Sequence, residues 1–272
     1  MAKTIITVAL TGAATPKAKN PALPCTPKEI AADAIACWKQ GASIVHLHMR
    51  DDELRGTMDK ERFRETVNII RGETDLICNL SSSGESGAPN MRRMEHIIEL
   101  KPELATFDAG SINLANGAIF MNKADFLMEL GTAMIENGVK PEVEIMDLGF
   151  LAAADYYLAK GALKAPIHYQ FVLGFFSGAP ATPENLALLK GKLPAGATWS
   201  ALGIGAAHMP ILYAAIAMGG HVRVGLEDNL YYSRGVLATN TMLVERAARV
   251  ITEFGNEVAT PDEAREILGL KK

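Results

Sequence analysis

The chain has little of several features on which common protein classes depend. Its 272 residues include three cysteines, Cys25, Cys37 and Cys78, which are too few and too scattered for a disulfide framework. No Cys-x-x-Cys pair suggests a thiolate metal site, and no Gly-x-Gly-x-x-Gly follows the first strand-like segment. The sequence therefore excludes a disulfide-rich scaffold and gives no sign of a dinucleotide-binding fold.

An excess of positive charge and a long apolar run are also missing. The formal net charge is −4 and Lys and Arg form no long run, which argues against nucleic acid or an anionic membrane as a partner. The most apolar late stretch, residues 211–218, is far too short to cross a bilayer. Residues 1–4 lead at once into strand-like sequence without a secretory signal pattern, so we expect reduced thiols and a cytoplasmic location.

What the sequence does contain is a regular alternation of strand-like and helix-like segments. Helix starts such as Thr26-Pro27 and Thr182-Pro183, and glycines after helices such as Gly41 and Gly138, separate the strands. The expected strands cover residues 4–11, 43–51, 75–82, 103–108, 142–147, 166–173, 198–204 and 221–228. Eight such units predict an α/β fold, a single (β/α)8 TIM barrel domain over residues 1–272, in preference to an open doubly wound sheet.

The last part of the chain predicts two further helices. An eighth helix is expected at roughly residues 236–254, and Thr260-Pro261-Asp262-Glu263 opens a short helix after it. We expect this C-terminal extension to serve packing or assembly.

Two histidines one residue apart, His46 and His48, lie in the apolar stretch 43–51. Side chains alternate across a strand, so both imidazoles lean to one face and can share a cation. Zinc suits them, because a catalytic zinc site commonly uses three protein ligands and keeps one position open. A pair of core histidines bonded to their neighbours is the alternative, and this motif by itself does not separate the two.

The eighth expected strand also ends in chemically active residues. Catalytic groups of such barrels collect at the carboxyl ends of the strands, so Glu227 can join the histidine pair as a third ligand. An ordinary helix cap or solvated turn is the alternative for Glu227 and Asp228. Arg223 argues against it, because a guanidinium inside a barrel must be paired and these acids are the obvious partners. Pairing Arg223 with Asp228 requires a bend in the strand, which Gly225 would allow.

Six motifs are spread over the length of the chain. They are Thr11-Gly12-Ala13, Asn20 to Pro24, Gly41-Ala42, His46 to Arg50, Lys101-Pro102-Glu103 and Arg223 to Asn229. Together they resemble the β-keto acid cleavage enzymes, and the resemblance runs essentially from end to end. It implies a zinc-dependent barrel, usually a homotetramer, that converts a β-keto acid and acetyl-CoA into acetoacetate and a new acyl-CoA.

The resemblance also implies roles for individual residues. The metal ligands of the family fall on His46, His48 and Glu227, and all three match. The arginine–aspartate pair that forms the substrate carbanion falls on Arg223 and Asp228. Ser81 is implied as a further catalytic residue at the end of the third strand.

The implied substrate pocket includes two departures from the family pattern. The run Ser82-Ser83-Gly84, with Ser81, would receive the substrate carboxylate through hydroxyls and backbone N–H groups. Thr106 and Asp108 fall where the family lines its pocket, and Asp108 replaces a more usual asparagine. Ala14 stands where relatives that act on amino-substituted substrates place an acidic residue, so we expect a substrate without a positive charge at its distal end.

Two other classes of function stay open on the sequence alone. A metal-dependent hydrolase of the amidohydrolase type is also a barrel with a His-x-His strand, but its motif lies on the first strand and it takes ligands from the fifth. Residues 142–147 offer neither histidine nor lysine. A non-catalytic metal-binding barrel is the other alternative, and its expected signature is a closed site with four ligands.

Overall fold

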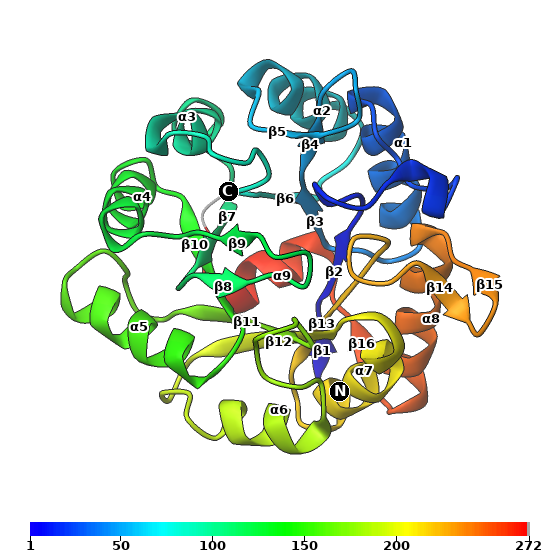
Figure 1. Ribbon diagram of the computed structural model, residues 1–272. Coiled ribbons are helices and arrows are strands. Elements are labelled where there is room, and N and C mark those ends of the chain that lie inside the picture. Colours follow the sequence, from blue (N-terminus) through cyan, green and yellow to red (C-terminus); the bar gives the residue numbers. More distant parts are fainter. Residues whose placement is uncertain (271–272) are drawn as a thin grey trace.

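The computed structural model describes residues 1–270 and contains one closed parallel barrel of eight strands (Figure 1). Each barrel strand overlaps one of the eight expected ranges. The barrel strands are β2 (Ile6–Ala9), β3 (Ile44–Leu47), β6 (Ile77–Leu80), β7 (Leu104–Asp108), β10 (Lys140–Ile145), β11 (His168–Leu173), β12 (Thr198–Gly203) and β13 (His221–Val224). Neighbours around the barrel follow chain order, and it closes where β13 pairs with β2, with Arg223 opposite Thr7. The predicted (β/α)8 barrel is confirmed.

Helices surround the strands (Figure 1). They are α1 (Pro27–Lys39), α2 (Lys60–Glu73), α3 (Asn90–Leu100), α4 (Ala124–Glu136), α5 (Leu148–Ala159), α6 (Pro183–Lys190), α7 (His208–Ala217), α8 (Asn240–Glu253) and α9 (Pro261–Leu268), with short 3-10 turns η1 (Lys17–Lys19) and η2 (Gly205–Ala207). Helix α1 begins where Thr26 and Glu29 form a complete capping box, as the sequence predicts. Within residues 1–270, no helix is long and apolar enough to cross a membrane.

The start of the eighth helix was predicted too early. Residues 236 and 237 form β15 (Val236–Leu237), which pairs with β14 (Tyr231–Ser233), and α8 begins only at Asn240. The physical reason is the Thr239 side chain, which accepts a hydrogen bond from the backbone N–H of Met242 and so fixes the first turn there.

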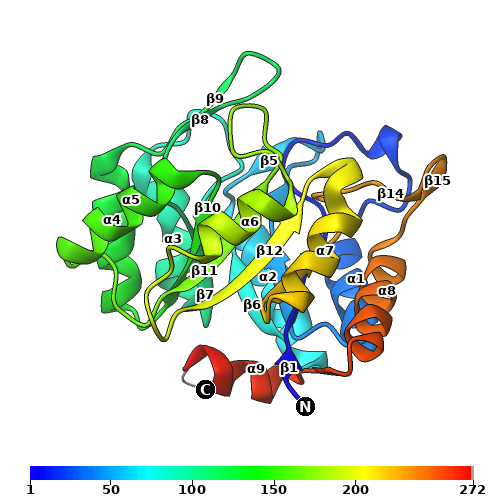
Figure 2. The same cartoon turned by 90° about the horizontal axis from the view of Figure 1, so that it is seen from below.

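Helix α9 closes the end of the barrel at which the strands begin, as Figure 2 shows. Its residues Ala264 and Leu268 pack on the apolar layer of Ile5, Ile44, Ile77 and Leu104. Arg265 donates to both carboxylate oxygens of Glu103, at 2.6 and 3.0 Å. The short pair β1 (Lys3–Thr4) and β16 (Glu257–Val258) lies beside it. The helix is therefore a plug that covers apolar strand residues, which confirms a packing role for it.

Short hairpins lie at the other end of the barrel, where the strands finish. They are β4 (Met49–Arg50) with β5 (Gly56–Thr57), β8 (Ile112–Asn113) with β9 (Ile119–Phe120), and β14 with β15. The single strand predicted over residues 43–51 is therefore two strands, and His48 lies at the break between β3 and β4. This break turns the chain out of the barrel wall just at the second histidine.

Candidate functional site

His46, His48 and Glu227 converge at the end of the barrel where the strands finish. Nε2 of His46 lies 3.5 Å from Glu227 Oε1, and Nε2 of His48 lies 3.7 Å from the same oxygen. One possible ligand atom from each of the three residues lies within 4.8 Å of the other two. A search of residues 1–270 for three or more His, Cys, Asp or Glu side chains that could share a metal ion gives this group. The structure thus brings the three predicted ligands together.

Two glycines allow this convergence. Gly225 has φ +146°, and a Cβ there would overlap the backbone of Ala9 on the neighbouring strand β2. The bend lets the chain after β13 turn inward, which is the bend that the sequence argument required. Gly12 has φ +59°, and a Cβ there would lie 2.9 Å from Cγ of Glu227. The loop after β2 therefore packs directly against the side chain of Glu227.

The electrostatic surroundings favour a cation at this cluster. Burial lowers the pKa of His48 to about 4, so its imidazole is neutral near pH 7. Burial would raise the pKa of Glu227, but His46, His48 and Arg223 outweigh it and hold this pKa well below its usual range. A neutral imidazole beside an ionised carboxylate is the ligand state that zinc requires.

Buried atoms of the three side chains that lack a hydrogen-bond partner also favour a metal ion here. Oε2 of Glu227 and Nδ1 of both His46 and His48 are buried and have no hydrogen-bond partner within the described residues. Buried polar groups of native proteins are almost always paired. Two imidazoles and a carboxylate would supply three ligands to one ion and leave a fourth position open.

Arg223 binds three carboxylates at once. Its side chain donates to Glu144 Oε1 at 3.0 Å, to Glu227 Oε1 at 2.5 Å and to both oxygens of Asp228 at 3.0 and 3.1 Å. The guanidinium is 4% exposed, so these are desolvated, charge-assisted bonds. The predicted pairing of Arg223 with Asp228 is present.

Asp228 lies in an environment suited to a base. Burial raises its pKa, and the attraction of Arg223 opposes this rise without cancelling it. The bidentate contact holds the carboxylate in one orientation. A fixed carboxylate with a raised pKa binds a proton more tightly than a solvated one does.

Asp108 is buried beside a second acid. It stands opposite Glu144 on the neighbouring strand β10, and burial raises the pKa of both groups. Oδ2 of Asp108 has no partner within the described part of the chain. Adjacent buried carboxyls that resist ionisation would hold a proton between them, which reduces the repulsion that Asp108 exerts on an anion.

The serine run after β6 is tied to its own surroundings. The backbone N–H of Ser82 donates to Thr106 Oγ1 at 3.0 Å, and the N–H of Ser83 donates to Ser81 Oγ at 3.2 Å. Gly84 has φ +142°, and a Cβ there would lie 3.2 Å from Nδ1 of His48. Gly84 therefore lies beside the cluster of His46, His48 and Glu227. The N–H groups of Ser82 and Ser83 and the hydroxyls of Ser81 and Ser82, which were predicted to bind an anion, already have partners.

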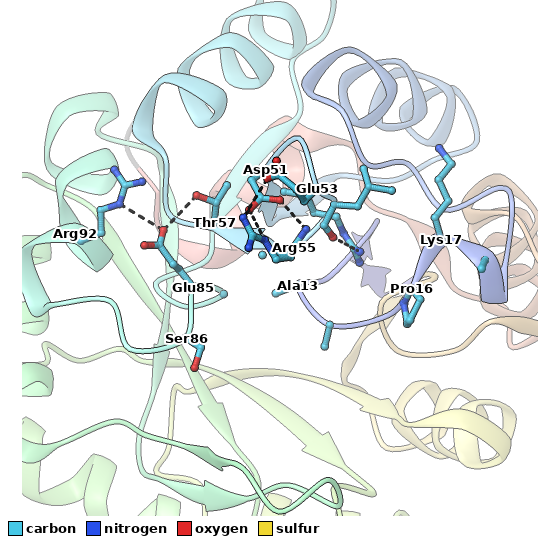
Figure 3. Close-up of a pocket in the computed structure, with 16 residues that line it drawn as sticks. Ala13, Pro16, Lys17, Asp51, Glu53, Arg55, Thr57, Glu85, Ser86 and Arg92 are labelled. Carbon is cyan, nitrogen blue, oxygen red and sulfur yellow. Dashed lines mark hydrogen bonds and ion pairs between the residues drawn. The ribbon is translucent and has the colours of Figure 1, made fainter.

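A cavity of about 900 Å³ opens beside this cluster (Figure 3). The loop after β2, the β4–β5 hairpin and the loop after β6 line it, with Ala14 and Gly84 among the lining residues. Gly84 lines the cavity and leaves little room for a Cβ against His48, so one residue separates the cavity from the cluster. Ala14 therefore lies where a substrate tail could extend, and its methyl group offers no charge.

Sequence reasoning missed two buried side chains of the site. Glu144 supplies the third acid to Arg223, and the alternation Glu142-Val143-Glu144 within an apolar strand was the signal that could have found it. Arg50 is 2% exposed and donates to the carbonyls of Thr11, Gly12 and Leu54 at 2.8, 3.0 and 3.2 Å. It fastens the loop after β2 to the β4–β5 hairpin, and no spacing in the sequence predicts that.

The hydrolase alternative finds no ligand on the fifth strand. Strand β10 includes Lys140, a residue outside the range that the sequence assigned to it, but Lys140 Nζ donates to the carbonyl of Leu268 at 2.6 Å. This places the amine at the plugged end of the barrel, away from His46 and His48.

Comparison with known proteins gives consistent matches over the whole chain. A family model described as beta-keto acid cleavage enzyme matches residues 3–270. A 3-keto-5-aminohexanoate cleavage enzyme of Fusobacterium nucleatum is 44% identical over 274 residues, which cover 100% of both chains. A 3-dehydrocarnitine:acetyl-CoA trimethylamine transferase of Rhizobium meliloti is 35% identical over 289 residues, covering 98% of this chain and 96% of that one.

Solved structures support the fold. The apo structure of ObcA aligns with a TM-score of 0.82 at 20% identity, over 92% of this chain. The chain spans 66% of the length of that protein. At this identity the likeness bears on the barrel architecture alone.

Proposed function

The chain belongs to the β-keto acid cleavage enzyme family, and from this we propose that it is a zinc-dependent enzyme of carbon-chain acyl exchange. In this reaction a β-keto acid and acetyl-CoA become acetoacetate and a new acyl-CoA. The enzyme is an acyltransferase, since relatives named as acetyl-CoA-dependent transferases match it along nearly its full length. The observation that carries the proposal is the Arg223–Asp228 pair held beside the cluster of His46, His48 and Glu227.

Asp228 is the proposed base. Fixed on Arg223, its carboxylate takes a proton from the carbon between the keto and carboxyl groups of the substrate. A zinc ion held by His46, His48 and Glu227 would act as a Lewis acid on the keto oxygen and lower the cost of negative charge there. Arg223 keeps its three acids in place while the charge at the site changes.

The remaining steps need no covalent bond to the protein. The carbanion forms a C–C bond to the thioester carbon of acetyl-CoA, and the C–S bond breaks to release the CoA thiolate. The thiolate adds to the former keto carbon, and the C–C bond between that carbon and the former α-carbon breaks in a retro-Claisen step. Asp228 returns its proton to the departing acetoacetate carbanion. The products are acetoacetate and the new acyl-CoA, so atoms and charge balance.

Ser81, Ser82, Ser83 and Thr106 are the proposed contacts of the substrate carboxylate. Ser81, Ser82 and Ser83 follow the end of β6, and Thr106 lies in the middle of β7, where its Oγ1 accepts from the N–H of Ser82. Two backbone N–H groups and the Ser81 hydroxyl are already bonded within this part of the chain. We propose that the carboxylate is met mainly by the hydroxyls, because a hydroxyl can exchange its bond by rotating, whereas a backbone N–H cannot. Asp108 limits this pocket on the side of β7, and a proton shared with Glu144 would make it compatible with an anion.

The substrate is proposed to carry no positive charge at its distal end. Ala14 lines the cavity with a methyl group, so this position offers no carboxylate. An ammonium beside Ala14 would lose hydration without gaining an ion pair there, which costs roughly tenfold in kcat/KM for each 1.4 kcal/mol.

Comparison of two related acids tests this choice. We expect a higher kcat/KM for 3-oxohexanoate than for its 5-amino analogue, and Ala14→Glu should narrow or reverse the preference. A clear preference of the unmodified enzyme for the amino compound would refute the role of Ala14.

A direct assay tests the function itself. Metal-loaded protein with 3-oxohexanoate and acetyl-CoA should form acetoacetate and butanoyl-CoA in equal amounts. Elemental analysis should find about one zinc per chain, and His48→Ala should lose it. Unchanged zinc content in His48→Ala would refute His48 as a ligand. Absence of both products over a panel of β-keto acids would refute the proposed reaction.

The setting of the enzyme is part of the proposal. We propose one barrel domain over the chain, a homotetrameric assembly and a cytoplasmic location. The three cysteines are free and buried, which suits a reducing compartment. Size-exclusion chromatography with light scattering would measure the assembly directly.

A further inference from the structure

The cavity next to the cluster of His46, His48 and Glu227 is larger than a short keto acid requires. Its volume of about 900 Å³ is near the upper end for small-molecule sites, which span about 300–1,000 Å³. It extends from Gly84, next to His48, to an open rim formed by η1, the β4–β5 hairpin and α3. A keto acid of a few carbons would fill the inner part and leave the outer part free.

The floor of the cavity is made of closely packed backbone. A Cβ on Gly56 would lie 2.6 Å from Cβ of Ala13 and would overlap the carbonyl of Gly84. The hairpin therefore rests directly on the loops after β2 and β6, and Arg50 fastens it to the first of them. This floor is fixed before a ligand enters, so a long ligand can lie across it without reordering the chain.

The rim of the cavity carries three cations on different elements. Lys17 belongs to η1, Arg55 lies in the turn of the β4–β5 hairpin, and Arg92 lies in the first turn of α3. Figure 3 shows Lys17 and Arg92 at opposite ends of the cavity with Arg55 between them. Together with Arg50 these cations outnumber the three lining acids, although the chain as a whole has a net charge of −4.

The ion pairs at the rim are of the kind that a phosphate can replace. The Arg55 side chain is 73% exposed, and its pairs with Asp51 and Glu53 lie in the open turn. Arg92 contacts Glu85 at 3.4 Å and Glu95 at 3.2 Å, and Lys17 contacts Glu29 at 2.9 Å. The Arg55 pairs are exposed, and exposed pairs contribute only about 0–1 kcal/mol each, while a phosphate offers a guanidinium two parallel, charge-assisted bonds.

We propose that this cavity is the acyl-CoA subsite, with Lys17, Arg55 and Arg92 binding the phosphates of CoA and the thioester arm lying over Gly84 and Ala13. The inference rests on the proposed function for the identity of the ligand. It assigns the binding of the phosphorylated end to residues that have no contact with His46, His48 or Glu227 within the described interactions. The long ligand would cross the rigid floor and present its acyl group beside His48.

Direct binding of CoA, without turnover, tests the assignment. Calorimetric titration of the full-length, metal-loaded protein with CoA should give a dissociation constant that rises about 5- to 20-fold in each of Lys17→Met, Arg55→Met and Arg92→Met. Pantetheine, which has no phosphate, should bind all four proteins alike. Arg249→Met is the matched control, because Arg249 is an exposed arginine in a carboxylate pair on α8 and should leave CoA binding unchanged.

The outcomes separate this inference from the proposed function. CoA that binds the unmodified protein and the three rim variants equally overturns the inference while the proposed function stands. Equal weakening in Arg249→Met shows a general charge effect and also overturns it. Selective weakening in the rim variants supports the subsite even if no acyl exchange is found. Absence of CoA binding to the unmodified protein overturns the inference and the proposed function together.

Discussion

Asp228 is the single residue whose proposed role can be separated most cleanly from the fold. Asparagine has nearly the same shape but cannot accept a proton, so Asp228→Asn should lower kcat by about 10²- to 10⁴-fold. Zinc content should stay close to that of the unmodified protein. The thermal midpoint should fall only slightly, because the amide oxygen keeps one of the two bonds from Arg223 and the amide nitrogen loses the other. Deuterium exchange at the α-carbon of the substrate, followed by NMR, should also be lost.

An exposed acid provides the control for this substitution. Asp52 is exposed and pairs with Arg62 at the surface, so Asp52→Asn should leave turnover and exchange unchanged. Rapid α-carbon exchange in Asp228→Asn would show that another group removes the proton.

The sequence predicted the parts of the site that short-range patterns encode. His46 and His48 follow from strand alternation, and Glu227 follows from the rule that catalytic groups lie at strand ends. Glu144 could not be predicted as a partner of Arg223, because its position depends on how strand β10 faces strand β13 across the barrel. The two residues are far apart in sequence, and spacing carries no information about such a contact.

Gly225 is the element-scale feature that lets β13 deliver Glu227 and Asp228 to the site. Alanine there would meet the backbone of Ala9 at a φ of +146°, so Gly225→Ala should lower the free energy of unfolding by about 2–4 kcal/mol. Zinc affinity should fall as well, because the turn that holds Glu227 must shift.

Gly269 is a matched control for this prediction. It also has positive φ, at +64°, but a Cβ there would meet no atom within 4 Å, so Gly269→Ala should cost only about 1–2 kcal/mol and leave zinc affinity unchanged. Urea unfolding with metal titration measures both effects. Equal destabilisation by the two substitutions would mean that backbone conformation alone, without the contact to Ala9, decides the result.

The capping box of α1 gives this element a pH dependence. Bonds from the backbone N–H of Cys25, then those from Lys17 and Thr26, outweigh desolvation and lower the pKa of Glu29 from 4.5 to about 2. A lowered pKa means that the stabilisation is present above pH 4.5 and is lost as the pH falls toward 2. Glu29→Gln should therefore destabilise the protein by at most about 1 kcal/mol at pH 7, and the difference should shrink between pH 4.5 and pH 3.

Urea unfolding at pH 7, 4.5 and 3 measures that difference. The control is Glu65→Gln, at an exposed position in the middle of α2, which should give a small difference at every pH. A Glu29→Gln difference that stays constant down to pH 3 would show that the charge of Glu29 plays no part.

At the scale of the whole molecule, the proposed site and the plug formed by α9 lie at opposite ends of the barrel. Leu268 of α9 is 1% exposed and packs on the apolar layer at the plugged end. Leu268→Ala should lower the free energy of unfolding by about 2–5 kcal/mol and leave kcat/KM within about twofold, because the site lies at the other end.

Thermal unfolding and the acyl-exchange assay test this division. Glu266→Ala, on the exposed side of the same helix, should change stability by no more than about 0.5 kcal/mol. A loss of kcat/KM in Leu268→Ala that exceeds the loss of folded protein would show that the plug and the site are coupled. The existence of α9 was predicted from its capping residues, but its position was not, because nothing local records which apolar layer a terminal helix will cover.

The closure of the barrel between β13 and β2 also constrains how the protein comes to be made. Residues 6–9 can pair with β3 on one side soon after synthesis, but their other edge finds β13 only after residues 222–224 have been synthesised, and His46 meets Glu227 equally late. Until then the first strand has an unpaired edge and the metal-type cluster lacks its carboxylate. The three side chains of the cluster therefore come together only near the end of translation, when the nascent chain no longer has open strand edges.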